Sequence, residues 1–67
     1  MKENALRIWR AAPPESREAA TASIARVAAR VREGADIHQT GDIEASAFSQ
    51  AGLDTAVFWA GLILSEV

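Results

Sequence analysis

The chain has 67 residues, no cysteine and a single histidine, His38, so disulfides and thiolate metal sites are excluded. A chain of this length buries only about 60% of its unfolded surface, so its stability depends on good helix packing or on a partner. The net charge of −2 conceals an asymmetry between the two halves. All seven basic residues lie at or before Arg32, whereas five acids and no basic residue follow Gly34.

The sequence carries no sign of export or membrane insertion. Its first residues are mixed in polarity, unlike the apolar segment of an export signal. The longest apolar run, residues 56–64, has about half of the roughly 20 residues that span a bilayer. We therefore expect a soluble, cytoplasmic protein. Six arginines against one lysine are typical of a GC-rich genome and indicate a bacterial or phage source.

Residues 2–12 are expected to form the first helix, because their apolar side chains recur at three- and four-residue spacing. Together with Met1, these side chains are Ala5, Ile8, Trp9 and Ala12. The Pro13-Pro14 pair ends this helix, and Pro14 suits the first position of the next one.

Residues 14–33 are expected to form the second helix, which is rich in the strong helix formers alanine and arginine. One side carries an apolar stripe at helical spacing, made of Ala20, Ile24, Val27, Ala28 and Val31. Gly34 suits the position that follows a helix end, where a left-handed conformation is common.

Residues 35–41 are expected to form a loop, because Thr40-Gly41-Asp42 has the composition of a turn. Asp42 would then cap a third helix over residues 42–51. Gly52-Leu53-Asp54 indicates a break, after which Asp54 caps a fourth helix over residues 54–66.

These elements predict an all-α fold, a small bundle of three to four short helices in a single domain over residues 1–67. Two alternatives are open for the last third of the chain. The third and fourth helices could be continuous, with Gly52 inside them at a cost of about 1 kcal/mol. The last segment could also be a strand, which would have to pair between chains.

The residue types used in catalysis gather only around His38, which lies near Asp36 and Asp42 in the expected loop. So short a loop offers no pocket wall, so we expect these side chains to satisfy the turn and cap the next helix. The acids do not have the spacing of a calcium-binding loop, and there is no phosphate-binding glycine loop. We therefore expect no enzymatic activity, no cofactor and no metal.

DNA binding is an alternative function. Residues 48–55 resemble the turn of a helix-turn-helix motif, although Phe48 stands where that motif has a small residue. The helix that would read the bases lacks Arg, Lys, Asn and Gln. Arg26 and Arg30 could contact phosphates from the second helix. Because the chain is acidic, we regard nucleic acid as the less favoured partner.

The apolar run at residues 56–64 favours protein binding instead. On a helical wheel Phe58, Trp59 and Leu62 form one side, and the other, broader side consists of Ala56, Val57, Ala60, Ile63, Leu64 and Val67. A helix that is apolar all round must be covered all round. We expect Phe58, Trp59 and Leu62 to bind a protein partner or a second copy, in a small regulatory, inhibitory or assembly protein. The alternative is the central helix of a monomer, covered by Trp9 and the stripe of the second helix.

Overall fold

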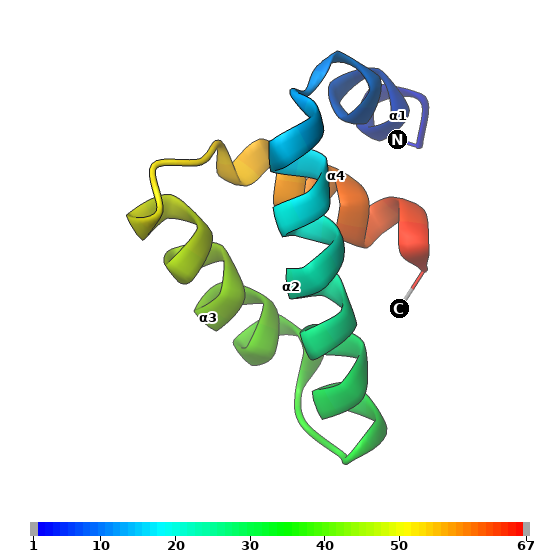
Figure 1. The fold of residues 1–67 in the computed structure, drawn as a ribbon. Helices are drawn as coiled ribbons and strands as arrows, with labels where there is room; N and C mark the ends of the chain where they lie inside the picture. Colours follow the sequence, from blue (N-terminus) through cyan, green and yellow to red (C-terminus); the bar gives the residue numbers. More distant parts are fainter. Residues whose placement is uncertain (1, 67) are drawn as a thin grey trace.

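The computed structural model describes residues 2–66, and within this range the chain forms four α-helices and no strand (Figure 1). They are α1 (Lys2–Ala11), α2 (Pro14–Arg32), α3 (Ile37–Gln50) and α4 (Thr55–Ser65). The predicted all-α bundle is confirmed, and the strand alternative for the last segment is wrong.

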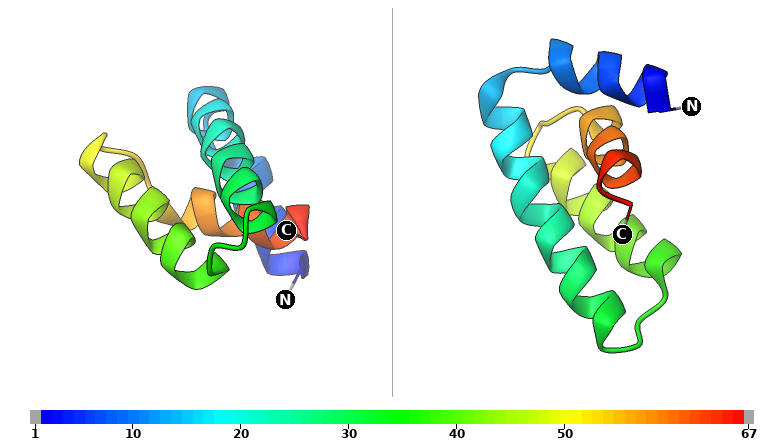
Figure 2. Two further views of the ribbon diagram at one scale, coloured as in Figure 1. Left: turned by 90° about the horizontal axis from the view of Figure 1, so that it is seen from below. Right: turned by 90° about the vertical axis from the view of Figure 1, so that its right-hand side faces the viewer.

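The helix α4 packs on each of the other three helices. It passes behind α2 in Figure 1, and in the right view of Figure 2 it lies between α1 above and α3 below, with α2 to its left. The Cα atoms extend only 15 Å along the shortest axis of the molecule, about the depth of two packed helices. Ala56 and Ile63 of α4 are exposed, so the other three helices do not cover this part of the central helix.

The ends of α2 and α3 are set by glycines in the left-handed conformation. Gly34 has a φ of 99° and Gly52 a φ of 80°. After α3, Gly52 N–H donates to Ser49 O at 2.9 Å and Leu53 N–H donates to Phe48 O at 3.2 Å, which is the Schellman pattern of a helix end. The predicted break at Gly52 is therefore confirmed, and α3 and α4 are separate helices.

The start of α3 differs from the prediction. The helix begins at Ile37 rather than near residue 42, so residues 37–41 are helical and the loop expected there is wrong. Asp36 Oδ2 accepts a hydrogen bond from Gln39 N–H at 3.2 Å, so Asp36 is the cap in place of Asp42. His38 lies in the first turn of this helix and is exposed.

This difference gives a first prediction. Replacing Asp36 with alanine should lower the free energy of unfolding by about 1 kcal/mol, because an N–H at the start of α3 loses its partner. Asp42 is exposed inside the helix, so the matched Asp42→Ala variant should change this free energy by less than about 0.5 kcal/mol. Urea unfolding at low micromolar protein measures both values, and the opposite order would place the cap at Asp42.

The core lies where α2, α3 and α4 meet. Phe58 and Val27 are fully buried there, and Phe48 packs on Phe58 with ring centroids 6.0 Å apart. Ala20 is also fully buried, and Ile24 and Val31 are half-buried against the same cluster. The predicted stripe of the second helix is thus the face that α2 presents to the rest of the protein.

Candidate functional site

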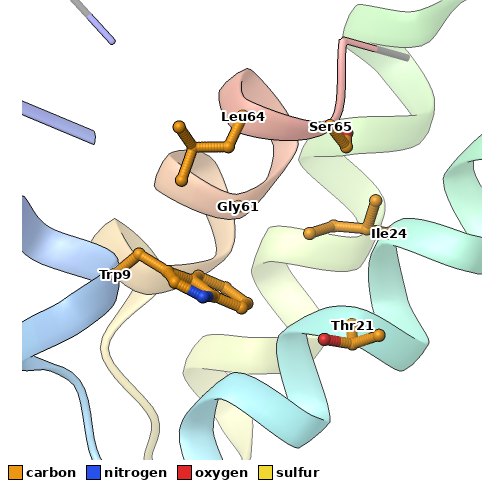
Figure 3. Close-up of a pocket in the computed structure, with 6 residues that line it drawn as sticks. All are labelled: Trp9, Thr21, Ile24, Gly61, Leu64 and Ser65. Atoms are coloured by element: carbon orange, nitrogen blue, oxygen red, sulfur yellow. The ribbon is translucent and has the colours of Figure 1, made fainter. Parts of the chain in front are cut away.

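The buried side of α4 consists of Val57, Phe58, Ala60 and Gly61. Gly61 lets α1 and α2 approach closely, since a Cβ at this position would lie 2.6 Å from Ile24 Cδ1 and 2.7 Å from Trp9 Cζ3. Figure 3 shows Trp9 and Ile24 converging on this glycine. The alternative prediction, in which Trp9 and the stripe of the second helix cover the last helix, is therefore correct for this side of α4.

The three residues predicted to bind a partner do not share one exposed side. Phe58 has 0% of its surface exposed, so its expected place on the surface is wrong. Trp59 and Leu62 are half-buried and lie over Gly41 of α3, where an added Cβ would be 3.1 Å from Trp59 Cη2 and 3.8 Å from Leu62 Cδ2. Gly41 is thus a contact surface for the tryptophan ring, and Trp59 and Leu62 keep an exposed part.

The uncovered side of α4 carries Ala56, Trp59 and Ile63, which we call the outer strip. Ala56 and Ile63 are exposed, with 43% of Ile63 accessible, and Trp59 is half-buried. Their spacing of i, i+3 and i+7 places them along one line of the helix. On the α1 side, Ile63 and Ala60 line a hollow of about 170 Å³ together with Asn4, Ala5 and Ile8. The outer strip therefore lies between α1 and the Gly41 region of α3.

A second hollow lies on the opposite side of α4 (Figure 3). It has a volume of about 290 Å³ and is lined by Trp9, Thr21, Ile24, Gly61, Leu64 and Ser65. Its two hydroxyl groups are already engaged, because Thr21 donates to Arg17 O and Ser65 donates to Leu62 O, both at 2.8 Å. A ligand site needs polar groups that fix the orientation of the ligand. This hollow is mainly an apolar gap between packed helices.

The arginines proposed for phosphate contact have different surroundings. Arg26 Nε donates to Glu44 Oε1 at 3.1 Å, and a terminal nitrogen of Arg26 donates to Ser23 Oγ at 3.0 Å. Arg26 thus ties α2 to α3, with its charge opposed by a carboxylate. Arg30 is exposed. In a helix-turn-helix motif α4 would be the helix that contacts the bases. It packs against the other three helices, and its outer strip has no side chain that could form hydrogen bonds with bases.

An ion pair joins the start of α1 to the end of α4. Lys2 Nζ donates to Glu66 Oε1 on the protein surface. This hydrogen bond, followed by the attraction of the ammonium charge, lowers the pKa of Glu66 below its usual value. Because the folded-state pKa is depressed, the pair stabilises the fold above the ordinary pKa of a glutamate and loses this effect as the pH falls through the folded-state pKa.

Among the helices of residues 2–66, none combines the length and the apolar character that crossing a bilayer requires. No protein-family model, curated protein or solved structure matches the chain. Function must therefore be inferred from the surface of the molecule itself, where the outer strip is the uncovered part of its most apolar helix.

Proposed function

We propose that this protein is a non-catalytic interaction module, which binds a protein partner or its own copy through the outer strip of α4. The supporting observation is that an entirely apolar helix face, with Ile63 43% accessible, is left without a covering helix. A small regulatory, inhibitory or assembly protein would have this form. In this proposal Trp59 and Leu62 remain partner-binding residues, and Ile63 and Ala56 are added to them. Phe58 is not a binding residue, because it is buried and packs against the ring of Trp59.

The accessible area of the outer strip limits the free energy that its burial can contribute to binding. Full burial of an isoleucine side chain stabilises by about 1.5–3 kcal/mol, so covering the exposed part of Ile63 should contribute roughly 1 kcal/mol. The indole of Trp59 adds a large, rigid apolar surface, and tryptophan is among the residues that dominate the free energy of interfaces. Several such contacts would be needed, because association has a large entropic cost.

The chain offers a matched pair of variants for the test. Ile63 and Ile43 are both exposed isoleucines, at 43% and 56%, but Ile43 belongs to α3 and is not part of the outer strip. We expect Ile63→Glu to abolish capture of protein partners, including a differently tagged copy of the chain, when affinity purification from the source cell is followed by mass spectrometry. Ile43→Glu should leave the captured set unchanged.

Both variants should stay folded, because both side chains are accessible to water; circular dichroism checks this. Loss of capture in Ile43→Glu alone, or no specific capture by the unchanged chain, would contradict the proposal.

A further inference from the structure

We propose that a hollow at the start of α2 and α4 binds a small primary ammonium ion with an apolar body, through the hydroxyl of Ser16 and the carboxylate of Asp54. None of the residues that line this hollow belongs to the outer strip. The inference therefore goes beyond the proposed function and is tested separately from it.

The hollow lies where the turn between α1 and α2 meets the turn between α3 and α4. Figure 1 shows the start of α4, in orange, beside the start of α2. The volume is about 380 Å³, within the range of roughly 300–1,000 Å³ that small-molecule sites have. Its apolar wall includes the buried Ala12 and Val57 and the half-buried Ile8 and Leu53. This wall can cover the apolar body of a small ligand.

Ser16 supplies a hydroxyl group that is available to a ligand. The residue lines the hollow with only 6% of its surface exposed. Among the side-chain hydrogen bonds of residues 2–66, none involves this hydroxyl. No fully enclosed side-chain N or O atom of these residues lacks a partner, so the Ser16 oxygen keeps some contact with solvent. Because the rest of the residue is buried, this contact lies in the hollow.

This free hydroxyl distinguishes the hollow from the one in Figure 3. There, Thr21 and Ser65 both donate to backbone carbonyl groups, so neither hydroxyl proton is left for a ligand. A buried hydroxyl without a partner in the protein loses free energy that a hydrogen bond from a ligand restores.

Asp54 supplies a negative charge at the same hollow. Its Oδ1 accepts a hydrogen bond from Ala56 N–H at 3.0 Å, as the cap of α4. A carboxylate has two oxygens and about four acceptor positions, so it can accept further hydrogen bonds while it caps the helix. Neither of the ion pairs within residues 2–66 includes Asp54, and no Lys or Arg is among the described residues that line the hollow. This charge therefore favours a cation.

The start of a helix usually attracts anions, but this place is poorly suited to one. Pro13 and Pro14 have no N–H groups, so the start of α2 offers fewer donors, and the Asp54 carboxylate already occupies the start of α4. An ammonium group carries three N–H donors and a positive charge. It can therefore donate to the Ser16 hydroxyl and to the Asp54 carboxylate, while its apolar body contacts the wall.

The test compares three probes that share a phenyl body and differ in the charge of the head group: phenethylammonium, phenethyl alcohol and phenylacetate. Each is titrated into ¹⁵N-labelled protein in about 50 mM salt, where charges are weakly screened. We expect phenethylammonium to shift the amide signals of Ser16, Leu53 and Val57 with a dissociation constant of about a millimolar, as its small size implies. Phenethyl alcohol should bind about fivefold more weakly, and phenylacetate should bind more weakly still.

Two variants separate the roles of the polar groups. Asp54→Asn keeps a good cap for α4 but removes the charge, so it should weaken phenethylammonium about fivefold and leave phenethyl alcohol unchanged. Ser16→Ala should weaken both probes about threefold, because each loses one hydrogen bond. The matched control is Asp36→Asn, which makes the same change at the cap of α3, away from the residues that line the hollow, and should leave binding unchanged. Circular dichroism checks that all three variants are folded.

Three results would overturn the inference. The first is that tens of millimolar phenethylammonium leaves the signals of Ser16, Leu53 and Val57 in place. The second is that phenylacetate binds as tightly as phenethylammonium. The third is that Asp36→Asn weakens phenethylammonium as much as Asp54→Asn does, since the effect would then reflect net charge alone. None of these results concerns the outer strip, so partner capture that is sensitive to Ile63→Glu would still support the proposed function.

Discussion

Replacing Phe58 with alanine is expected to unfold the protein under conditions in which the wild type is folded. The side chain is fully buried, and its ring lies 6.0 Å from that of Phe48 and 5.1 Å from that of Trp59. Truncating such a side chain costs about 3–5 kcal/mol. At roughly 0.05–0.15 kcal/mol per residue, a chain of this length has a total stability of similar size. Thermal melting followed by circular dichroism should therefore show little or no cooperative transition.

The matched control for this variant is Leu62→Ala, four residues later on the same helix. Leu62 is only half-buried, so its truncation should cost clearly less and leave a cooperative transition at a lower temperature. If Phe58→Ala melted like Leu62→Ala, Phe58 would belong to the surface, as the partner-binding hypothesis drawn from the sequence requires.

Replacing Gly61 with valine should have the second largest effect on stability. A Cβ at this position would already lie within 2.7 Å of both Ile24 Cδ1 and Trp9 Cζ3, and valine adds two further methyl groups. Forcing extra carbons into a packed contact typically costs about 1–3 kcal/mol, and the loss should lie at the upper end of this range because α1 and α2 both have to move. The midpoint of urea unfolding measures this loss.

Ala56→Val is the matched control, because it places the same residue on the exposed side of the same helix. It should cost less than about 1 kcal/mol, which reflects helix propensity alone. Equal losses for the two variants would show that α4 tolerates valine equally on both sides. The close approach of Trp9 and Ile24 to Gly61 would then be wrong.

The helix ends that depend on neighbouring residues could be read from the sequence. Gly34 and Gly52 adopt the left-handed conformation that was expected, and Asp54 accepts a hydrogen bond from Ala56 N–H at 3.0 Å, as a cap should. Gly41 was wrongly taken as part of a turn, because the reason for a glycine at this position lies in the tertiary packing and not in the local sequence. It lies inside a helix to make room for Trp59, which is 18 residues further along the chain. No local pattern separates such a glycine from one in a turn.

The direction in which α4 faces could not be read from its sequence for a related reason. When a helix is apolar all round, the hydrophobic pattern marks no buried side, so the packing of the other helices decides. Phe58 was therefore assigned to the surface although it lies at the centre of the core. Ile63 was placed on the other side of the helical wheel, outside the expected binding surface, and it is exposed. The exposed residues Ala56 and Ile63 lie on the side of the wheel that was not expected to bind a partner.

The two tryptophans allow the most direct test of the outer strip as the binding surface between copies. Trp59 lies on this strip, whereas Trp9 packs against Gly61 on the opposite side of α4. Their indole N–H groups give two separate signals in a ¹H–¹⁵N spectrum, which a Trp9→Phe variant assigns. On dilution from about millimolar to micromolar protein, binding between copies through the outer strip predicts that the Trp59 indole and the Ile63 amide signals shift while those of Trp9 and Ile43 stay in place. Constant signals throughout, or shifts confined to Trp9 and Ile43, would contradict it.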